Sequence, residues 1–252
     1  MDPLECAVEI AKEAGILLRD RSGALEIGEK SARGDLVTAA DRESERFIVE
    51  RLRARFPTAT ILGEEGGIRA GSADERWIID PLDGTTNYAH GYPLYCVSIG
   101  YERRGHMVAG AVYAPVLDEL YAAERGSGAR CNGHPLKVSA IGLVREALLC
   151  TGFVPARYER NGANFARLSQ LAQAVRRDGS AALDLCFVAR GVFDAFWELD
   201  LSPWDVAAGS LIVGEAGGRV SACDGGTFSV DDASIVASNG RIHAQMVQAL
   251  NA

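Results

Sequence analysis

The 252-residue sequence lacks any long hydrophobic run: none approaches the about 18 apolar residues that a membrane-spanning helix needs. Its first residues, Met1-Asp2-Pro3-Leu4-Glu5, have neither the basic region nor the apolar core of a signal peptide, so we expect none. These two absences predict a cytoplasmic protein that does not interact with a membrane.

Paired cysteines are lacking too. The six cysteines are scattered, none forms a C-x-x-C motif, and most lie in apolar surroundings. We therefore expect buried free thiols in a reducing cytosol. Cys96, Ser98 and the four histidines have no partner motif for nucleophilic catalysis, so we interpret them as structural or surface residues.

Basic residues are not clustered: the formal net charge is −8, and the chain has no basic tract. Binding to a phosphate backbone requires clustered Lys and Arg, which argues against nucleic acid as the main ligand. A protein of this charge would need bound cations to hold an anionic substrate. Repeats and low-complexity segments are also missing from the sequence.

What the sequence does contain is 48% hydrophobic residues, enough for a sizeable core. Helical periodicity predicts helices at about 3–20, 39–55, 156–175, 181–189, 203–216 and from 241 onward. Strand patterns predict strands at 58–62, 94–101, 108–113, 120–123, 129–131, 136–138, 147–151 and 192–197, one more ending at Ile79, and a hairpin at 25–37. We expect an N-terminal α+β half, 1–140, and a C-terminal α/β half, 141–252.

The most informative segment, 77–87, places two carboxylates three residues apart at the end of an apolar run. Pro81 has a fixed φ angle and no N–H for a sheet, so the chain must turn there. Such a turn lets Asp80, the Leu82 carbonyl and Asp83 converge on one point. These hard oxygen ligands suit Mg²⁺, which keeps water and substrate phosphate in its other positions.

The three residues that follow, Gly84, Thr85 and Thr86, could open a helix whose free N–H groups hold an anion. Metal and phosphate would then meet at one corner. Asp-Gly is also a common turn, however, and Asp83 could be a plain helix N-cap. The segment alone leaves both interpretations open.

Acidic residues occupy two further corners. Glu64 and Glu65 follow a short strand and precede two glycines, which fits a metal or general-base site but also a solvated acidic loop. Asp205 follows Ser202 and Pro203 at a helix start, where it could be a metal ligand or only part of a capping box.

Three other charged residues give weaker signals. Glu198 ends an apolar strand, where a charged residue is expected either to be exposed to solvent or to have a functional role. Lys30 lies in the polar hairpin and could simply be solvated. Asp41 could favour the start of the second helix through the helix dipole.

Taken in order, the motifs resemble those of the inositol monophosphatase family. They are Asp35–Asp41 with Lys30 before it, Gly63–Glu65, Asp80–Asn87, Gly179–Asp184, Pro203–Gly209 and Glu215–Gly218. The resemblance covers nearly the whole chain. It implies an α/β fold of α+β type, a layered αβαβα sandwich of the inositol monophosphatase and fructose-1,6-bisphosphatase type, and a homodimer.

The resemblance also implies Mg²⁺-dependent hydrolysis of a small phosphate monoester, with two to three ions in each active site. One ion would bind Glu64, Asp80 and the Leu82 carbonyl, and a second would bind Asp80, Asp83 and Asp205. A third, looser ion would use Glu64 and water beneath the hairpin at 25–37. Lithium sensitivity is expected with such a third site.

By the same resemblance, Thr85 and Asp41 would pair to help activate the attacking water, with Glu64 alongside. The N–H groups of residues 84–86 would hold the phosphate, and Glu198 with the backbone of 180–181 would meet the substrate hydroxyls. The implied substrate-binding residues are Lys30, Gly84, Thr85, Thr86, Ser180, Ala181 and Glu198.

Thr86 and Asn87 resemble the members of the family that act on inositol phosphates and fructose 1,6-bisphosphate, since the nucleotide phosphatases tend to carry lysine at the position of Thr86. We rank inositol monophosphate first, fructose 1,6-bisphosphate second or as a joint activity, and histidinol phosphate third. The alternative class is a regulatory binding module that has lost the chemistry. The four intact acidic residues argue against it.

Overall fold

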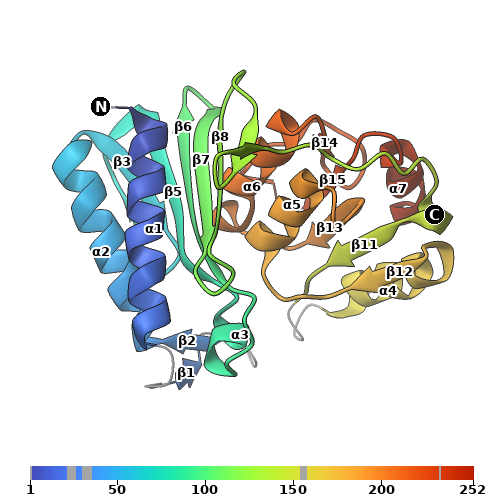
Figure 1. The fold of residues 1–252 in the computed structure, drawn as a ribbon, viewed down its shortest axis with the longest axis horizontal. Coiled ribbons are helices and arrows are strands. Elements are labelled where there is room, and N and C mark those ends of the chain that lie inside the picture. Colours follow the sequence, from blue (N-terminus) through green and yellow to red (C-terminus); the bar gives the residue numbers. More distant parts are fainter. Residues whose placement is uncertain (1, 22–26, 30–35, 154–157, 233) are drawn as a thin grey trace.

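The computed structural model describes residues 2–21, 27–29, 36–153, 158–232 and 234–252, with the backbone alone at 27–29, 36–38 and 158–160. Helical and sheet layers alternate across the molecule (Figure 1). Helices α1 (Pro3–Arg21) and α2 (Ala39–Arg55) form the first layer and pack on an eight-stranded sheet. The predicted αβαβα sandwich is confirmed.

The central helical layer consists of α5 (Ala181–Arg190) and α6 (Pro203–Glu215). Helix α6 contacts strands of the large sheet and also β14 (Arg219–Ser221) and β15 (Ser234–Ser238) of the second, five-stranded sheet. Helices α4 (Tyr158–Leu171) and α7 (His243–Leu250) lie on the far side of that second sheet (Figure 1). The division near residue 140 stays a prediction, since this central layer joins both sheets.

The large sheet is antiparallel except where β3 runs parallel to β5. Its order is β10 (His134–Pro135), β9 (Ala129–Cys131), β8 (Glu119–Glu124), β7 (His106–Ala114), β6 (Cys96–Arg103), β5 (Ser72–Asp83), β3 (Ala59–Gly63), β4 (Gly67–Arg69). Short α3 (Thr85–Ala89) follows β5, and the predicted hairpin is present as β1 (Ile27–Glu29) paired with β2 (Leu36–Thr38).

The smaller sheet is mixed, with parallel pairing of β12, β11 and β13 and antiparallel pairing around β15. Its order is β12 (Ala174–Arg176), β11 (Leu148–Thr151), β13 (Ala195–Leu199), β15 (Ser234–Ser238), β14 (Arg219–Ser221). A short 3₁₀ turn, η1 (Val144–Glu146), precedes β11.

Several expected elements differ from the structure. The helix predicted at 156–175 ends at Leu171, because the N–H groups of Gln173 and Ala174 donate to Ala147 O and lead the chain into β12. The strand predicted at 136–138 is absent from the described structure, and the hairpin partner of β9 is the two-residue β10. The strand predicted from 192 begins at Ala195, because Gly191 and the residues after it close helix α5.

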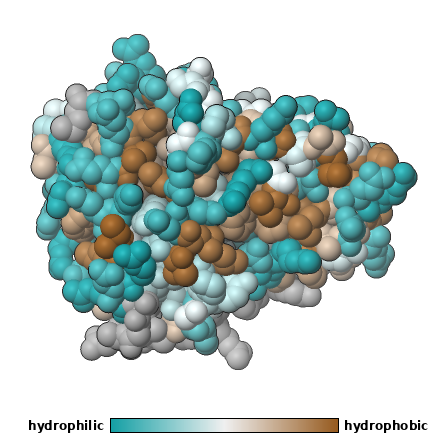
Figure 2. All heavy atoms as spheres, viewed as in Figure 1, coloured by the Kyte–Doolittle hydropathy of each residue, from teal (hydrophilic) through white to brown (hydrophobic). Residues whose placement is uncertain are grey.

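Apolar side chains fill the space between the layers, with Trp77, Tyr101 and Trp197 fully buried. Five of the six cysteines are buried and Cys131 is half-buried, and all six are free thiols, as expected. Figure 2 shows mostly hydrophilic residues over the α1 and α2 side, with hydrophobic residues visible in smaller groups. None of the helices in the described residues combines the length and apolar character that crossing a membrane requires.

Candidate active site

The end of strand β5 carries two of the predicted metal ligands on a bulge. The pairing register with β6 shifts between Asp80 and Asp83, so the predicted turn at Pro81 is a distortion within the strand. A bulge tolerates proline because its missing N–H breaks no regular ladder there. Asp80 and Asp83 are 2% and 8% exposed, and Leu82 N donates to Asp80 Oδ1 at 3.0 Å.

Asp83 is held by a segment about 100 positions further along the chain. Ser180 Oγ and the backbone N–H of Ala182, at the start of α5, both donate to Asp83 Oδ2 at 2.7 Å. The Cys96 thiol lies 3.8 Å from the same oxygen. These donors favour the charged carboxylate and partly offset the burial that raises the pKa of Asp83. Ser180 therefore turns its side chain toward Asp83.

The electrostatics of Asp80 bring the four predicted acidic ligands together. Burial raises the pKa of Asp80 well above its ordinary value, and the charges of Glu64, Asp83 and Asp205 raise it further. Coulomb repulsion of this kind falls off with distance, so the other three side chains lie near the buried Asp80, with Glu64 and Asp205 themselves half-buried. Carboxylates so gathered are stabilised by a cation between them.

The donors fit Mg²⁺ in chemistry, although the side chains are not arranged as a finished cage. In the described part of the chain, no three His, Cys, Asp or Glu side chains are grouped tightly enough to hold a metal ion. Asp80, Asp83 and Asp205 each accept a hydrogen bond from a protein donor, which holds the three carboxylates in place. An all-oxygen set that repels itself suits a hard divalent ion.

Asp205 belongs to a capping box at the start of helix α6, which was one of the two interpretations of this residue from the sequence. Its Oδ2 accepts the N–H of Ser202 at 2.7 Å and completes a capping box. The cap fixes the position of the carboxylate, and the charge of Asp205 is one of those that raise the pKa of Asp80. Capping and a metal-binding role are therefore compatible.

Thr85 and Asp41, the pair that the resemblance implies, are joined directly. Thr85 Oγ1 donates to Asp41 Oδ1 at 3.0 Å and also lies 3.1 Å from Leu82 O. Gly84 before it has a φ of +92°, and a Cβ there would lie 3.0 Å from Leu94 O, so a side chain would be strained and crowded. The first turn of α3 thus lies close against its surroundings.

One face of α2 carries three buried polar residues, of which the sequence analysis named only Asp41. Ser44 Oγ donates to Pro81 O at 2.8 Å. Glu45 accepts the N–H of Glu65 at 2.7 Å and Arg69 Nη2 at 3.0 Å, and it is 3% exposed. Asp41, Ser44 and Glu45 are spaced i, i+3 and i+4, so they lie on one helix face, and apolar residues continue that face. This spacing was the signal in the sequence that could have predicted their burial.

Replacing Glu45 with alanine is expected to lower the free energy of unfolding by about 1–3 kcal/mol, because the part-buried N–H of Glu65 loses its acceptor. Urea unfolding of metal-free protein measures this change. Glu45→Gln keeps an oxygen acceptor in the same place and serves as the control with a smaller loss. A Glu45→Ala protein as stable as the parent would contradict the assignment.

Glu198, at the end of β13, faces the acidic cluster from the second sheet. Burial raises the pKa of Glu198 well above its usual range, and the charges of Asp205 and Asp83 add to this, while Arg177 lowers it. Gly152 packs so closely on the Glu198 carboxylate that a Cβ would overlap it. Glu198 is therefore a fixed acceptor beside the acids.

Asp184, in the first turns of α5, is a buried acid that the sequence analysis did not assign. It is 1% exposed, and neither carboxylate oxygen has a hydrogen-bond partner in the described structure. Burial raises its pKa well above the ordinary value, with the charges of Asp178, Glu198 and Asp83 adding to the effect. Asp184 thus favours its neutral form in the folded chain.

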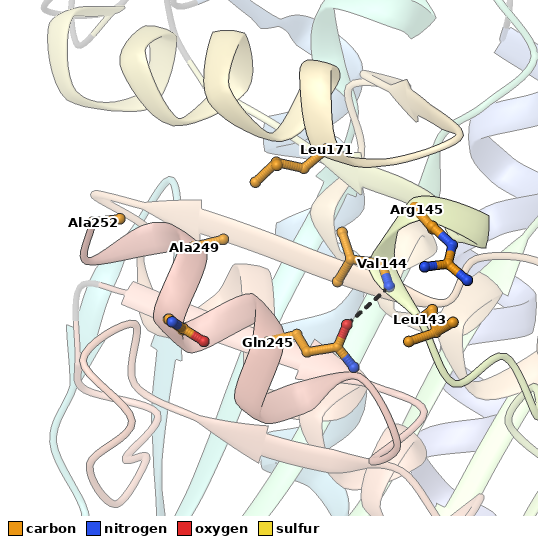
Figure 3. Close-up of a pocket in the computed structure, with 8 residues that line it drawn as sticks. Leu143, Val144, Arg145, Leu171, Gln245, Ala249 and Ala252 are labelled. Atoms are coloured by element: carbon orange, nitrogen blue, oxygen red, sulfur yellow. Dashed lines mark hydrogen bonds between the residues drawn. The ribbon is translucent and has the colours of Figure 1, made fainter.

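Of the other predicted residues, Lys30 lies outside the described residues. Thr86 is exposed and Ala181 half-buried at the start of its helix. A separate cavity of about 390 Å³ lies away from all of these (Figure 3). It is lined by Leu143, Val144, Arg145, Leu171, Gln245, Gln248, Ala249 and Ala252, none of them acidic.

The comparison with known families agrees with this geometry. The sequence profile described as "Inositol monophosphatase family" matches residues 2–252. This chain belongs to the inositol monophosphatase family. As a member, it is a phosphoric monoester hydrolase.

The family relatives carry more than one name. An inositol-1-monophosphatase of Synechocystis sp. is 45% identical, covering 99% of this chain and 88% of that protein. The Nus factor SuhB of Pseudomonas aeruginosa is 44% identical, covering 94% and 91%. A fructose-1,6-bisphosphatase/inositol-1-monophosphatase of Thermotoga maritima is 37% identical, covering 100% and 96%.

Among solved structures, the extragenic suppressor protein suhB from Bartonella henselae superposes with a TM-score of 0.93. It is 39% identical in sequence, and the match covers 98% of this chain and 97% of the other. The structural match therefore extends over nearly the whole chain.

Proposed function

We propose that this member of the family hydrolyses a small phosphate monoester, with inositol monophosphate as the first candidate, through attack of an activated water. The observation that carries the proposal is the buried Asp80, whose charge is opposed by Glu64, Asp83 and Asp205 beside the Thr85–Asp41 pair. Phosphoryl transfer requires positioning and charge neutralisation more than covalent chemistry by the protein, and this corner would offer both once divalent cations are bound.

The metal ligands in this proposal are Glu64, Asp80, the Leu82 carbonyl, Asp83 and Asp205, for two to three Mg²⁺ ions. When bound, Mg²⁺ supplies positive charge to the phosphoryl group and lowers the pKa of water. The carboxylates hold that charge in place, and the burial of Asp80 and Asp83 keeps it from being screened by solvent.

Thr85 and Asp41 handle the proton in this proposal. A Thr85 hydroxyl that donates to Asp41 leaves the lone pairs of Thr85 Oγ1 to accept a hydrogen bond from a water molecule. Glu64 would act alongside them as a second acceptor. A general base of this kind must lie within hydrogen-bond reach of the water it activates.

Substrate binding completes the proposal. The N–H groups of Gly84, Thr85 and Thr86 lie in the first turn of α3, before its intrahelical hydrogen bonds begin, and would meet the phosphate. Glu198 and the backbone of 180–181 would accept and donate hydrogen bonds to the substrate hydroxyls. Lys30 would contribute from the hairpin. A cytoplasmic homodimer without nucleic acid or membrane partners also belongs to the proposal.

The test is phosphate release from inositol 1-phosphate by the purified protein with Mg²⁺, set against fructose 1,6-bisphosphate and histidinol phosphate. We expect the highest kcat/KM for inositol 1-phosphate. Absence of release from all three substrates would reject the catalytic proposal and favour the regulatory module.

The positively charged side chain of Arg177 lies close enough to Glu198 to affect its pKa, and this supports fructose 1,6-bisphosphate as the second candidate. The guanidinium of Arg177 lies 4.6 Å from the Phe153 ring centroid and lowers the pKa of Glu198. A second phosphate on the far end of a sugar would find this positive charge at the substrate side of the site. The Thermotoga maritima relative has a name that joins both activities.

Replacing Arg177 with alanine is expected to lower kcat/KM for fructose 1,6-bisphosphate about tenfold, the effect of losing a charged hydrogen bond to phosphate. The value for inositol 1-phosphate should stay within about twofold of the parent's. Arg177→Lys keeps the charge and should recover most of the bisphosphate activity. An equal loss for both substrates would remove the reason for this second candidate.

A further inference from the structure

The side chain of Asn87, in the middle of α3, bridges two separate segments of backbone. Its amide nitrogen donates to Leu94 O at 2.6 Å and to Asp178 O at 2.7 Å. An asparagine amide nitrogen has two hydrogens, so both are used. Asn87 therefore ties α3 to the loop that precedes α5, 91 residues further along the chain.

The backbone next to this contact passes close over the Asn87 amide. Gly179 has a φ of +84°, and a Cβ there would lie 3.1 Å from Asn87 Oδ1. Any other residue would be both strained and crowded at that point. Glycine thus lets the loop dock directly on the asparagine side chain.

The residues after Gly179 return to the bulge at the end of β5. Ser180 Oγ and Ala182 N both reach Asp83 Oδ2, and Asp83 lies four residues before Asn87. The contacts close a ring: from Asp83 along α3 to Asn87, across to Asp178 O, and back through 180–182 to Asp83. Moving the loop away from Asn87 would move the donors away from Asp83.

We infer that Asn87 is a positioning residue: it holds segment 178–182 so that Ser180 and Ala182 orient the Asp83 carboxylate for a divalent cation. An oxygen that accepts two hydrogen bonds is fixed in place, so the position of Asp83 Oδ1 is fixed as well. The inference rests on the proposed metal-binding function of Asp83. Partners that orient metal ligands in this way typically change metal affinity about 10–100-fold when lost.

Isothermal titration of metal-free protein with Mg²⁺ alone tests this inference without any substrate. Asn87→Ala and Ser180→Ala should each weaken Mg²⁺ binding about tenfold. Ser180→Thr keeps the hydroxyl and should bind like the parent. Because both single variants break the same ring, the double variant Asn87→Ala/Ser180→Ala should be little weaker than either alone, rather than about a hundredfold weaker than the parent.

The matched control is Asn239→Ala, at an asparagine that clamps backbone far from the acids. Asn239 Nδ2 donates to Ile141 O and Ser139 Oγ, and its Oδ1 accepts two backbone N–H groups. This variant should lose thermal stability but bind Mg²⁺ with the parent's affinity. Should Asn87→Ala fail to fold, Asn87→Leu, which keeps the size of the side chain without its two N–H donors, takes its place in the same titration.

Two results would overturn the inference. One is an Asn87→Ala protein that, like the control, loses stability while keeping the parent's Mg²⁺ affinity. The other is a double variant whose loss of affinity equals the product of the single losses, since independent residues multiply. Failure of the parent protein itself to bind Mg²⁺ would overturn the proposed function, and with it the inference, and is seen in the first titration.

Discussion

Asp83→Asn is expected to lower phosphate release about a thousandfold while the protein remains folded. Asp83 gives one oxygen to Ser180 and Ala182, and an asparagine oxygen accepts the same two hydrogen bonds. The amide that replaces the other oxygen is neutral and cannot hold a cation. Losing about 4 kcal/mol of charge stabilisation corresponds to about a thousandfold in rate.

The measurement is kcat for inositol 1-phosphate at saturating Mg²⁺, together with urea unfolding in EDTA. Asp20→Asn, at an exposed position of α1, removes the same charge from the surface and should leave both quantities unchanged. An Asp83→Asn protein that turns over within about tenfold of the parent would show that Asp83 is not a metal ligand. A variant that unfolds in EDTA would show instead that Asp83 supports the fold.

Removing divalent cations with EDTA is expected to have the second large effect. Phosphate release should fall to background, and the free energy of unfolding should decrease as the pH rises above about 4. Saturating Mg²⁺ is expected to stabilise the folded protein by ~2.7 kcal/mol at a concentration 100 times its Kd. Without the cation, the gathered carboxylates repel one another. The EDTA-treated protein should therefore unfold at lower temperature at pH 8 than the Mg²⁺-loaded protein does.

The sign of the pH dependence follows from four buried acids. The pKa values of Asp80, Asp83, Asp184 and Glu198 are all raised in the folded chain above the unfolded value of about 4. Groups of this kind favour folding fully below their unfolded pKa, and this contribution is lost as the pH rises through their folded pKa. In EDTA, the contribution of these groups to the free energy of unfolding should therefore decrease as the pH rises from about 4 to their raised pKa values in the folded chain.

Thermal unfolding from pH 5 to 8, with EDTA and with Mg²⁺, measures this contrast. Asp184→Asn removes one of the four groups without touching a proposed metal ligand, so it should flatten the slope in both conditions. The parent's slope should be shallower with Mg²⁺ than with EDTA. Equal slopes in EDTA and Mg²⁺ would show that no cation binds among these acids.

The local elements of the fold were largely predictable. Helices α1, α2, α5 and α6 lie where periodicity and caps predict them, since such signals act within a few residues. Strands β4, β12, β14 and β15 were not predicted. Each is short, from three to five residues, and exists only because a partner strand lies beside it.

In the candidate site, too, local features could be predicted and contacts between distant segments could not. The residue types that bind oxygen-seeking cations were recognisable from their motifs, and Thr85 and Asp41 are paired as the resemblance implies. Their catalytic and metal-binding roles stay predictions. Ser44 and Glu45 were missed, and Asn87 was named only as part of a motif, because a polar residue on a helix has no signature of the loop that it will contact.

By itself, the sequence determined which family this chain belongs to and which acidic residues it can offer to a cation, since both depend on side-chain identity and local spacing. Only the tertiary structure decided that α5 holds Asp83, that Glu45 supports the loop of Glu64, and that Asp80 is buried among three other acids. These depend on distances between segments far apart in the chain, and such distances are set by the packing of whole layers.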